Sequence, residues 1–186
     1  MKILCFGDSN TFGYDPRSAF GSRYSHENRW VDIIQTKTGW DLINGGQNGR
    51  EIPHRSFELA SFQELIDRHT PDRLLVMLGT NDLLQGVGLN TIAVRMETFL
   101  QQVPCPVVLI APPPLQRGAW VEDDTLSASS CLLAETYRLL AERLQIPFID
   151  SGVWGIELTF DGVHFSESGH RIFADHLIAA LDTLPR

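Results

Sequence analysis

Short apolar runs, separated by longer amphipathic segments, are the feature that most limits how this chain can fold. The runs are three to five residues long and do not alternate with polar residues; they cover Ile3–Phe6, Leu74–Leu78, Val107–Ile110 and Pro147–Ile149, with a weaker run at Asp41–Ile43. Unalternating runs of this length are typical of parallel strands that are buried on both faces. The sequence therefore predicts five parallel strands.

Helical spacing of apolar residues fills the segments between these runs. The predicted helices are Trp30–Thr38, Phe57–His69, Thr91–Gln101, Ser129–Leu144 and Gly169–Leu181. Strands that alternate with helices form a parallel sheet, and right-handed crossovers place helices on both of its faces. We expect an α/β fold: a three-layer α/β/α sandwich around a five-stranded parallel sheet with a flavodoxin-like strand order, as a single domain over residues 1–186.

Composition narrows the class of partner. The net charge of −8 and the pI near 5.1 argue against nucleic acid and anionic membranes, both of which attract clustered Lys and Arg. No apolar run reaches membrane-spanning length, and the three cysteines form no disulfide or zinc pattern. We expect a cytoplasmic protein without metal or cofactor that acts on a small-molecule ester, and a homo-oligomer is compatible with the sequence.

Polar residues that could perform acyl transfer follow the apolar runs. Ser9 lies in a Gly-Asp-Ser turn after the first run, where it can act as a nucleophile at the start of a helical turn. Asp161 precedes His164 by three positions, so one loop can supply a base and the carboxylate that orients it. The amide of Asn81, after the third strand, can donate to a developing oxyanion. Each signature alone is more typical of a helix cap or a turn.

Taken together and in this order, these motifs resemble the SGNH hydrolase family, also called GDSL esterases and lipases. The resemblance implies a catalytic triad of Ser9, Asp161 and His164, with an oxyanion hole formed by Ser9, Gly49 and Asn81. Gly49 is preferred over Gly46 because the family pattern is Asn-x-Gly-x-x-Gly. The chain looks most similar to the arylesterase and acyltransferase branch, although Tyr14 stands where that branch often has tryptophan.

The expected activity is serine ester hydrolysis of short-chain acyl or aryl esters through an acyl-serine, with acyl transfer as a side activity. Aromatic and apolar residues of the long loops and of the segment before Asp161 are expected to line the substrate pocket: Phe12, Tyr14, Trp120, Trp154 and Ile156. Two alternatives stay open. Asp8, Asp82, Asp161 and His164 could hold a divalent cation in a phosphoesterase, or the fold could be a non-catalytic carbohydrate- or lipid-binding module.

Overall fold

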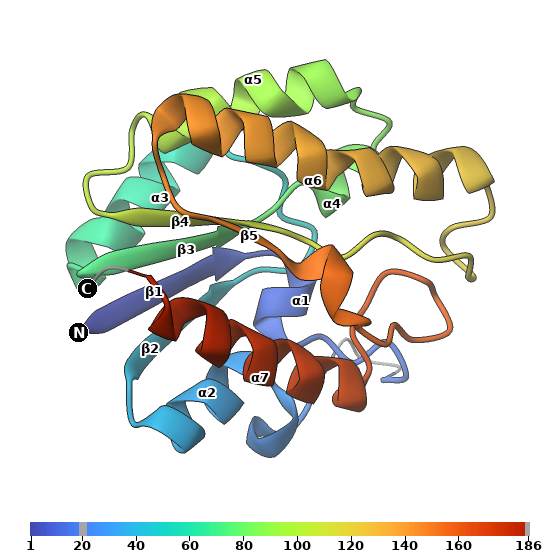
Figure 1. Ribbon diagram of the computed structural model, residues 1–186, viewed down its shortest axis with the longest axis horizontal. Coiled ribbons are helices and arrows are strands. Elements are labelled where there is room, and N and C mark those ends of the chain that lie inside the picture. The colour runs from blue at the N-terminus through green and yellow to red at the C-terminus, as the bar shows by residue number, and fades with distance from the viewer. Residues whose placement is uncertain (19–21, 185–186) are drawn as a thin grey trace.

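A five-stranded sheet forms the middle of the molecule (Figure 1). The strands are β1 (Lys2–Gly7), β2 (Asp41–Gly46), β3 (Arg73–Met77), β4 (Val107–Ala111) and β5 (Phe148–Asp150). All neighbours pair in parallel, in the order β2-β1-β3-β4-β5. The predicted parallel sheet and its flavodoxin-like order are confirmed.

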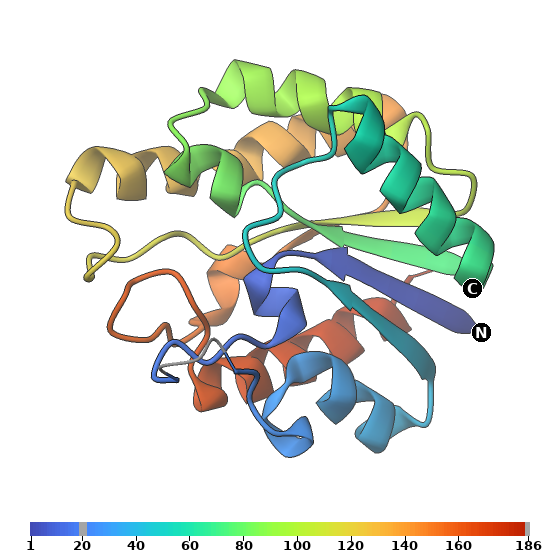
Figure 2. The same ribbon diagram turned by 180° about the vertical axis from the view of Figure 1, so that it is seen from behind.

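Helices cover both faces of this sheet (Figures 1 and 2). One face carries α3 (Ser56–His69), α4 (Thr80–Leu84), α5 (Leu89–Leu100) and α6 (Asp124–Leu144). The other carries α2 (Trp30–Thr38) and α7 (Glu167–Asp182), which pack against each other. The result is the expected three-layer sandwich. Short helical turns complete the chain at α1 (Ser9–Phe12), η1 (His26–Asn28) and η2 (Ser151–Trp154).

The computed structural model describes residues 1–18 and 22–184. The predicted domain range 1–186 therefore includes residues 19–21 and 185–186, which lie outside the described part. Within the described residues, no helix is long and apolar enough to cross a membrane.

Strand side chains divide the core into two layers, as the period-two geometry of a strand requires. Leu4 and Phe6 of β1 pack with α3, α5 and α6 on one side of the sheet. Ile3 and Cys5, the residues between and before them, pack with α2 and α7 on the other side. A strand buried on both faces must be apolar throughout, and this explains the unalternating runs in the sequence.

Local sequence chemistry sets the element ends. Helix α6 begins five residues before the predicted Ser129, because the Asp123 side chain caps it by accepting a hydrogen bond from the Thr125 N–H. At the end of β3, Gly79 adopts φ of +112°, a conformation that favours glycine, and turns the chain into α4. The strand ends thus place Ser9 and Asn81 in the first turns of α1 and α4, and Gly49 on the loop after β2, at one edge of the sheet.

Candidate active site

Ser9, His164 and Asp161 form a connected chain of hydrogen bonds. The His164 Nδ1–H donates to Asp161 Oδ2 at 2.6 Å, and this leaves Nε2 to accept from the Ser9 hydroxyl at 3.0 Å. All three side chains are buried, and 155 residues separate Ser9 from His164. The structure therefore brings a hydroxyl, an imidazole and a carboxylate into one hydrogen-bonded chain, the arrangement that a catalytic triad requires.

Asp161 is held ionised by its own loop. Oδ1 accepts from the N–H groups of Val163 and His164 at 2.9 and 3.0 Å, and from the Thr159 hydroxyl at 2.8 Å. Burial acts to raise the pKa of Asp161, but the hydrogen bonds from His164 and Val163 outweigh it and lower that pKa to about 2. The carboxylate is charged at neutral pH and can stabilise an imidazolium beside it.

Two aromatic rings pack against the imidazole. The Tyr14 ring lies 4.7 Å from the His164 ring, and the Trp120 ring meets it edge-on at 5.1 Å, measured between ring centroids. Trp120 is nevertheless 54% exposed, because it lies at the rim of the site. Both residues are therefore placed to fix the histidine ring on one side and to contact a ligand on the other.

Backbone donors lie beside the nucleophile. The N–H groups of Ser9 and Gly49 donate to no acceptor within the residues that the structure describes. Gly46, the competing glycine, instead donates its N–H to Asn44 Oδ1 at 3.0 Å. A Cβ atom at Gly46 would lie 2.1 Å from the Phe12 N, so this glycine permits close packing of β2 on α1. Gly49 is the glycine with a free donor.

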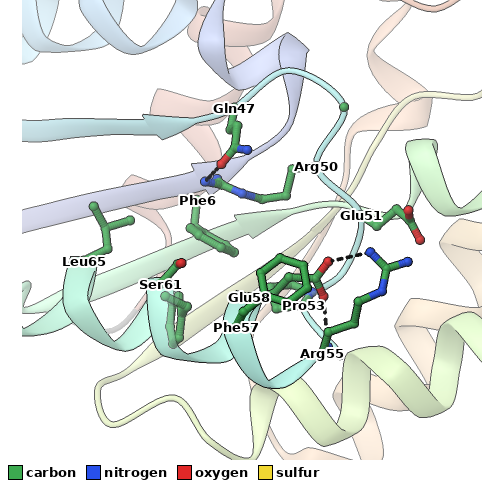
Figure 3. A pocket seen from close by; sticks show the side chains of 12 residues that line it. Phe6, Gln47, Arg50, Glu51, Pro53, Arg55, Phe57, Glu58, Ser61 and Leu65 are labelled. Carbon is green, nitrogen blue, oxygen red and sulfur yellow. Dashed lines mark hydrogen bonds and ion pairs between the residues drawn. The ribbon is translucent and has the colours of Figure 1, made fainter.

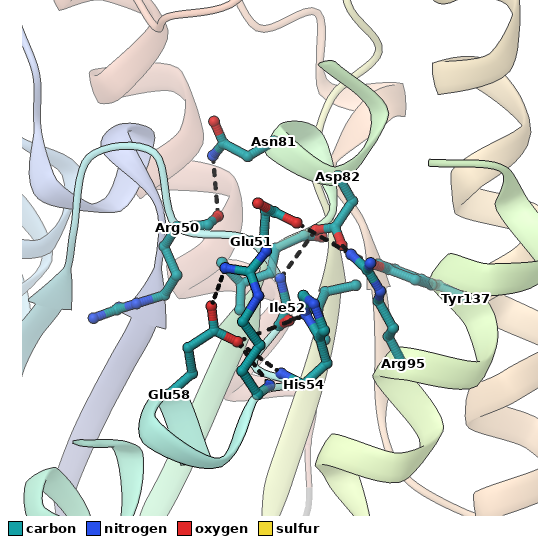
Figure 4. A network of polar contacts seen from close by, with 11 residues as sticks. Arg50, Glu51, Ile52, His54, Glu58, Asn81, Asp82, Arg95 and Tyr137 are labelled. Atoms are coloured by element: carbon teal, nitrogen blue, oxygen red, sulfur yellow. Dashed lines mark hydrogen bonds and ion pairs between the residues drawn. The ribbon is translucent and has the colours of Figure 1, made fainter. Parts of the chain in front are cut away.

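The amide of Asn81 and the carboxylate of Asp82 hold the loop that contains Gly49 (Figure 4). Asn81 Nδ2 donates to the Arg50 carbonyl at 3.0 Å, and Asp82 Oδ2 accepts from the Ile52 N–H at 3.0 Å. Arg95 of α5 in turn donates to Asp82 Oδ1 at 2.8 Å. Asn81, the predicted oxyanion donor, therefore uses one of the two N–H groups of its amide to bond the loop. Within the described residues, its other N–H group has no acceptor.

Asn10 is a functional residue that the sequence analysis did not single out. Its Nδ2 donates to the Val163 carbonyl at 3.1 Å, and its Oδ1 accepts from the Phe165 N–H at 2.8 Å. These are the two residues on either side of His164. Asn10 thus joins the Ser9 helix to the His164 loop, and the only signal in the sequence is its place next to Ser9.

Asp8 and Arg50 complete the surroundings of the nucleophile. Asp8 caps α1 through the Asn10 N–H at 2.9 Å, and burial raises the pKa of Asp8 to about 6. Arg50 donates to the Gly7 carbonyl at 2.8 Å and also to the Gly45 carbonyl. Arg50 therefore fastens the Gly49 loop to the ends of β1 and β2.

Three of the five expected pocket residues have other contacts. The Phe12 ring lies under the Arg23 guanidinium at 4.3 Å. Trp154 stacks on His176 and meets Phe173 edge-on, and Ile156 is buried in the same core layer. The half-buried Trp154 and the buried Ile156 therefore pack towards α7, and their expected place in the substrate pocket stays a prediction.

The residues proposed for a metal site do not gather. Asp82 pairs with Arg95 and Asp161 with His164, and within residues 1–18 and 22–184 no three His, Cys, Asp or Glu side chains are arranged to hold a metal ion. The donor set does not support the phosphoesterase alternative.

A serine, an imidazole and a carboxylate in this order, beside free backbone donors at the carboxyl edge of a parallel sheet, define the site of a serine hydrolase. The GDSL-like lipase/acylhydrolase family matches residues 5–172, and the chain belongs to this family.

Named relatives agree with this class. An arylesterase from Vibrio mimicus is 29% identical over 107 residues, which are 55% of this chain and 48% of that protein, so the chain matches about half of its length. The native M. smegmatis aryl esterase structure has a TM-score of 0.86 at 26% identity and covers 99% of both chains. A carbohydrate acetylesterase from Sinorhizobium meliloti has a TM-score of 0.79 at 26% identity, over 96% of this chain and 98% of that one.

Proposed function

We propose that the protein is a serine esterase that hydrolyses carboxylic esters through an acyl-Ser9 intermediate. The observation that carries this proposal is the continuous hydrogen-bonded chain from Ser9 Oγ through His164 to Asp161, with distances of 3.0 and 2.6 Å. A non-catalytic binding module has no need of a buried triad with this geometry.

The first step is attack of Ser9 Oγ on the ester carbonyl. His164 Nε2 takes the hydroxyl proton as the new C–O bond forms, and Asp161 stabilises the imidazolium. The N–H groups of Ser9 and Gly49, with the free N–H of Asn81, receive the oxyanion. Collapse of the tetrahedral intermediate expels the alcohol, which takes the proton from His164, and leaves the acyl group on Ser9.

The second step releases the acid. A water molecule loses a proton to His164 and attacks the acyl carbonyl, and Ser9 leaves with that proton returned to its oxygen. An alcohol that replaced water would receive the acyl group instead, so acyl transfer is the expected side activity.

The three free cysteines, Cys5, Cys105 and Cys131, support a reducing cytoplasmic setting for this chemistry.

Small esters are the proposed substrate class. The imidazole is flanked by the rings of Tyr14 and Trp120, and such rings favour flat or compact groups beside the scissile bond. The similar proteins include arylesterases and a carbohydrate acetylesterase, and this supports short acyl chains on an aryl or sugar alcohol. We therefore expect acetate and propionate esters to react faster than long-chain esters.

The test is hydrolysis of 4-nitrophenyl esters from acetate to laurate by the purified protein. Ser9→Ala should abolish the reaction, and Asp161→Asn should lower kcat about 10,000-fold because the ring loses its tautomer and orientation. Thr136→Ala, at a half-buried position of α6, is the matched control and should react at the wild-type rate. Unchanged hydrolysis by Ser9→Ala would refute the nucleophile.

A further inference from the structure

A second feature of the Gly49 loop is the pocket beside it, on the α3 side of the sheet (Figure 3). Its volume is about 450 Å³. The ends of β1 and β2 contribute Phe6 and Gln47, and α3 contributes Phe57, Ser61 and Leu65 to the opposite wall. The pocket is thus partly aromatic, and nothing in the triad chemistry uses it.

Arg50 supplies this pocket with unused hydrogen-bond donors. A guanidinium has five N–H groups. Three contacts within the described residues engage those of Arg50: the carbonyls of Gly7 and Gly45, and Gln47 Oε1 at 2.9 Å. The guanidinium also lies over the Phe6 ring at 4.1 Å. Two N–H groups of this half-buried cation are therefore left for a ligand.

The charge of Arg50 is not neutralised by a neighbouring carboxylate. Two acidic residues line the pocket, but Glu51 pairs with Arg95 at 3.1 Å and Glu58 with Arg55 at 3.2 Å. Within the described residues, Arg50 forms no ion pair. Burial lowers the pKa of Arg50 to about 10, and Asp8 acts on it only at longer range, so Arg50 remains charged at neutral pH. A half-buried cation without an ion pair in this position favours an anionic ligand.

Two further observations indicate that a ligand extends from the active site into this pocket. Gly49 lines the pocket, its N–H donates to no acceptor within the described residues, and the space where its side chain would lie is open. Its loop is bonded to the end of β1, two residues before Ser9, through the Gln47 N–H and the Gly7 carbonyl at 3.1 Å. Phe57, also in the lining, is 64% exposed and therefore presents apolar surface to the pocket. A group bound here would cover that ring.

We propose that this pocket binds a carboxylate carried by the ester substrate, with the free N–H groups of Arg50 as its partner and Phe57 and Leu65 against the adjoining apolar atoms. The inference rests on the proposed esterase function and names its substrate class: esters with a carboxylate on either the alcohol or the acyl part. A planar guanidinium suits a carboxylate because two parallel N–H groups can meet two oxygens.

The test compares kcat/KM for two pairs of esters that differ only in charge. The carboxylate lies on the alcohol part in 4-acetoxybenzoate, compared with 4-acetoxybenzamide, and on the acyl part in monomethyl succinate, compared with methyl succinamate. We expect at least one pair to favour the carboxylate by about 10-fold, the size of one charge-assisted hydrogen bond. The pair that does so identifies which part enters the pocket.

Arg50→Met should reduce this preference to about one, whereas Arg50→Lys should retain part of it. Because Arg50 also holds Gly7 and Gly45, Arg50→Met will slow the neutral esters too, and the ratio within a pair removes that effect. Phe57→Asp places a negative charge in the pocket wall without changing any Arg50 contact, and should lower the preference several-fold. Leu132→Asp is its matched control, since Leu132 is 57% exposed on α6.

Equal rates within both wild-type pairs would overturn the proposal, as would a preference that survives both Arg50→Met and Phe57→Asp. If Arg50→Met does not fold, the proposal is tested by comparing the preference for the carboxylate ester in Phe57→Asp with that in Leu132→Asp. A failure of the esterase function itself would be seen differently. The two uncharged esters, 4-acetoxybenzamide and methyl succinamate, would then show no hydrolysis that depends on Ser9.

Discussion

Asn10 is the single residue on which the meeting of nucleophile and base depends most directly. Its amide bonds the backbone on both sides of His164, and its own carbonyl accepts from the Trp30 indole N–H at 3.0 Å. These groups are buried, so water cannot replace the amide if it is lost. The side chain therefore has a positioning role for His164 rather than a role in proton transfer.

Asn10→Ala should lower kcat/KM for 4-nitrophenyl acetate by about 100-fold, because a shift of about 1 Å in a reacting group has an effect of that size. It should also lower the free energy of unfolding by about 1–3 kcal/mol, since a buried Phe165 N–H and Val163 carbonyl lose their partner. Stopped-flow kinetics and urea unfolding measure the two effects. Asn90→Ala, at an exposed position of α5, is the control, and a wild-type rate for Asn10→Ala would contradict the positioning role.

At the scale of elements, the loop between β2 and α3 is held from two sides. Arg50 bonds it to the ends of the strands, while Asn81 and Asp82 of α4 bond its backbone (Figure 4). Asp82 is fully buried, and burial raises its pKa against the opposing effects of the Ile52 N–H and Arg95. Arg95 of α5 thus opposes the effect of burial on this carboxylate, which accepts a hydrogen bond from the Gly49 loop.

Arg95→Met should therefore weaken oxyanion stabilisation from a distance. We expect kcat for 4-nitrophenyl acetate to fall about 10-fold with a smaller change in KM, because the oxyanion contacts act mainly in the transition state. Arg95→Lys should restore part of kcat. Arg143→Met is the control, since Arg143 forms a similar ion pair with Glu97 on the surface at 2.7 Å. A kcat for Arg95→Met equal to that of Arg143→Met would show that Asp82 holds the loop without it.

The sequence predicts some helices and strands better than others, because only an element with several patterned residues shows a recognisable apolar period. All five strands and the five long helices follow from their apolar patterns, because several residues share each pattern. Helices α1 and α4 have only four and five residues, too few for a helical period to be visible. The triad motifs are recognisable because Ser9 follows β1 closely and because Asp161 and His164 are only three positions apart.

Other parts of the site depend on contacts that no local pattern encodes. Asn10 bonds residues more than 150 positions away, and Arg95 and Asp82 meet only once α4 and α5 are packed. Trp154, an aromatic residue close in sequence to Asp161, stacks on His176 and meets Phe173 of α7 edge-on, a contact that its sequence position does not indicate. Residue type alone does not separate a core ring from a pocket ring.

For the whole molecule, two buried groups close to the site give opposite responses of stability to pH. Burial lowers the pKa of His170 from 6.5 to about 3, so below pH 6.5 the unfolded chain binds a proton that the folded protein does not, and stability falls with acid. Burial raises the pKa of Asp8 from 3.8 to about 6, so between pH 6 and 3.8 the folded protein binds the extra proton and stability rises with acid. Between pH 6 and 4 the two effects cancel.

Below pH 3.8 the effects of His170 and Asp8 on stability no longer cancel, because Asp8 is then protonated in both the folded and the unfolded state. Asp161, with its pKa lowered to about 2, then adds to the loss caused by His170, since the unfolded chain protonates this carboxyl first. Acid unfolding should therefore be steep below pH 4.

Substituting either buried group should expose the contribution of the other. As the pH falls from 6 to 4, Asp8→Asn should lose about 1.4 kcal/mol of unfolding free energy per pH unit relative to wild type. In this variant, proton binding by His170 in the unfolded chain is no longer offset by proton binding to Asp8 in the folded protein. His170→Phe should change by a similar amount in the opposite direction over the same interval. Urea unfolding at pH 7, 6, 5 and 4 measures both slopes, and the comparison with wild type removes every other titrating group. Parallel curves for all three proteins would mean that neither group titrates differently in the folded state, whereas slopes of opposite sign would locate the pH response of the fold beside its nucleophile.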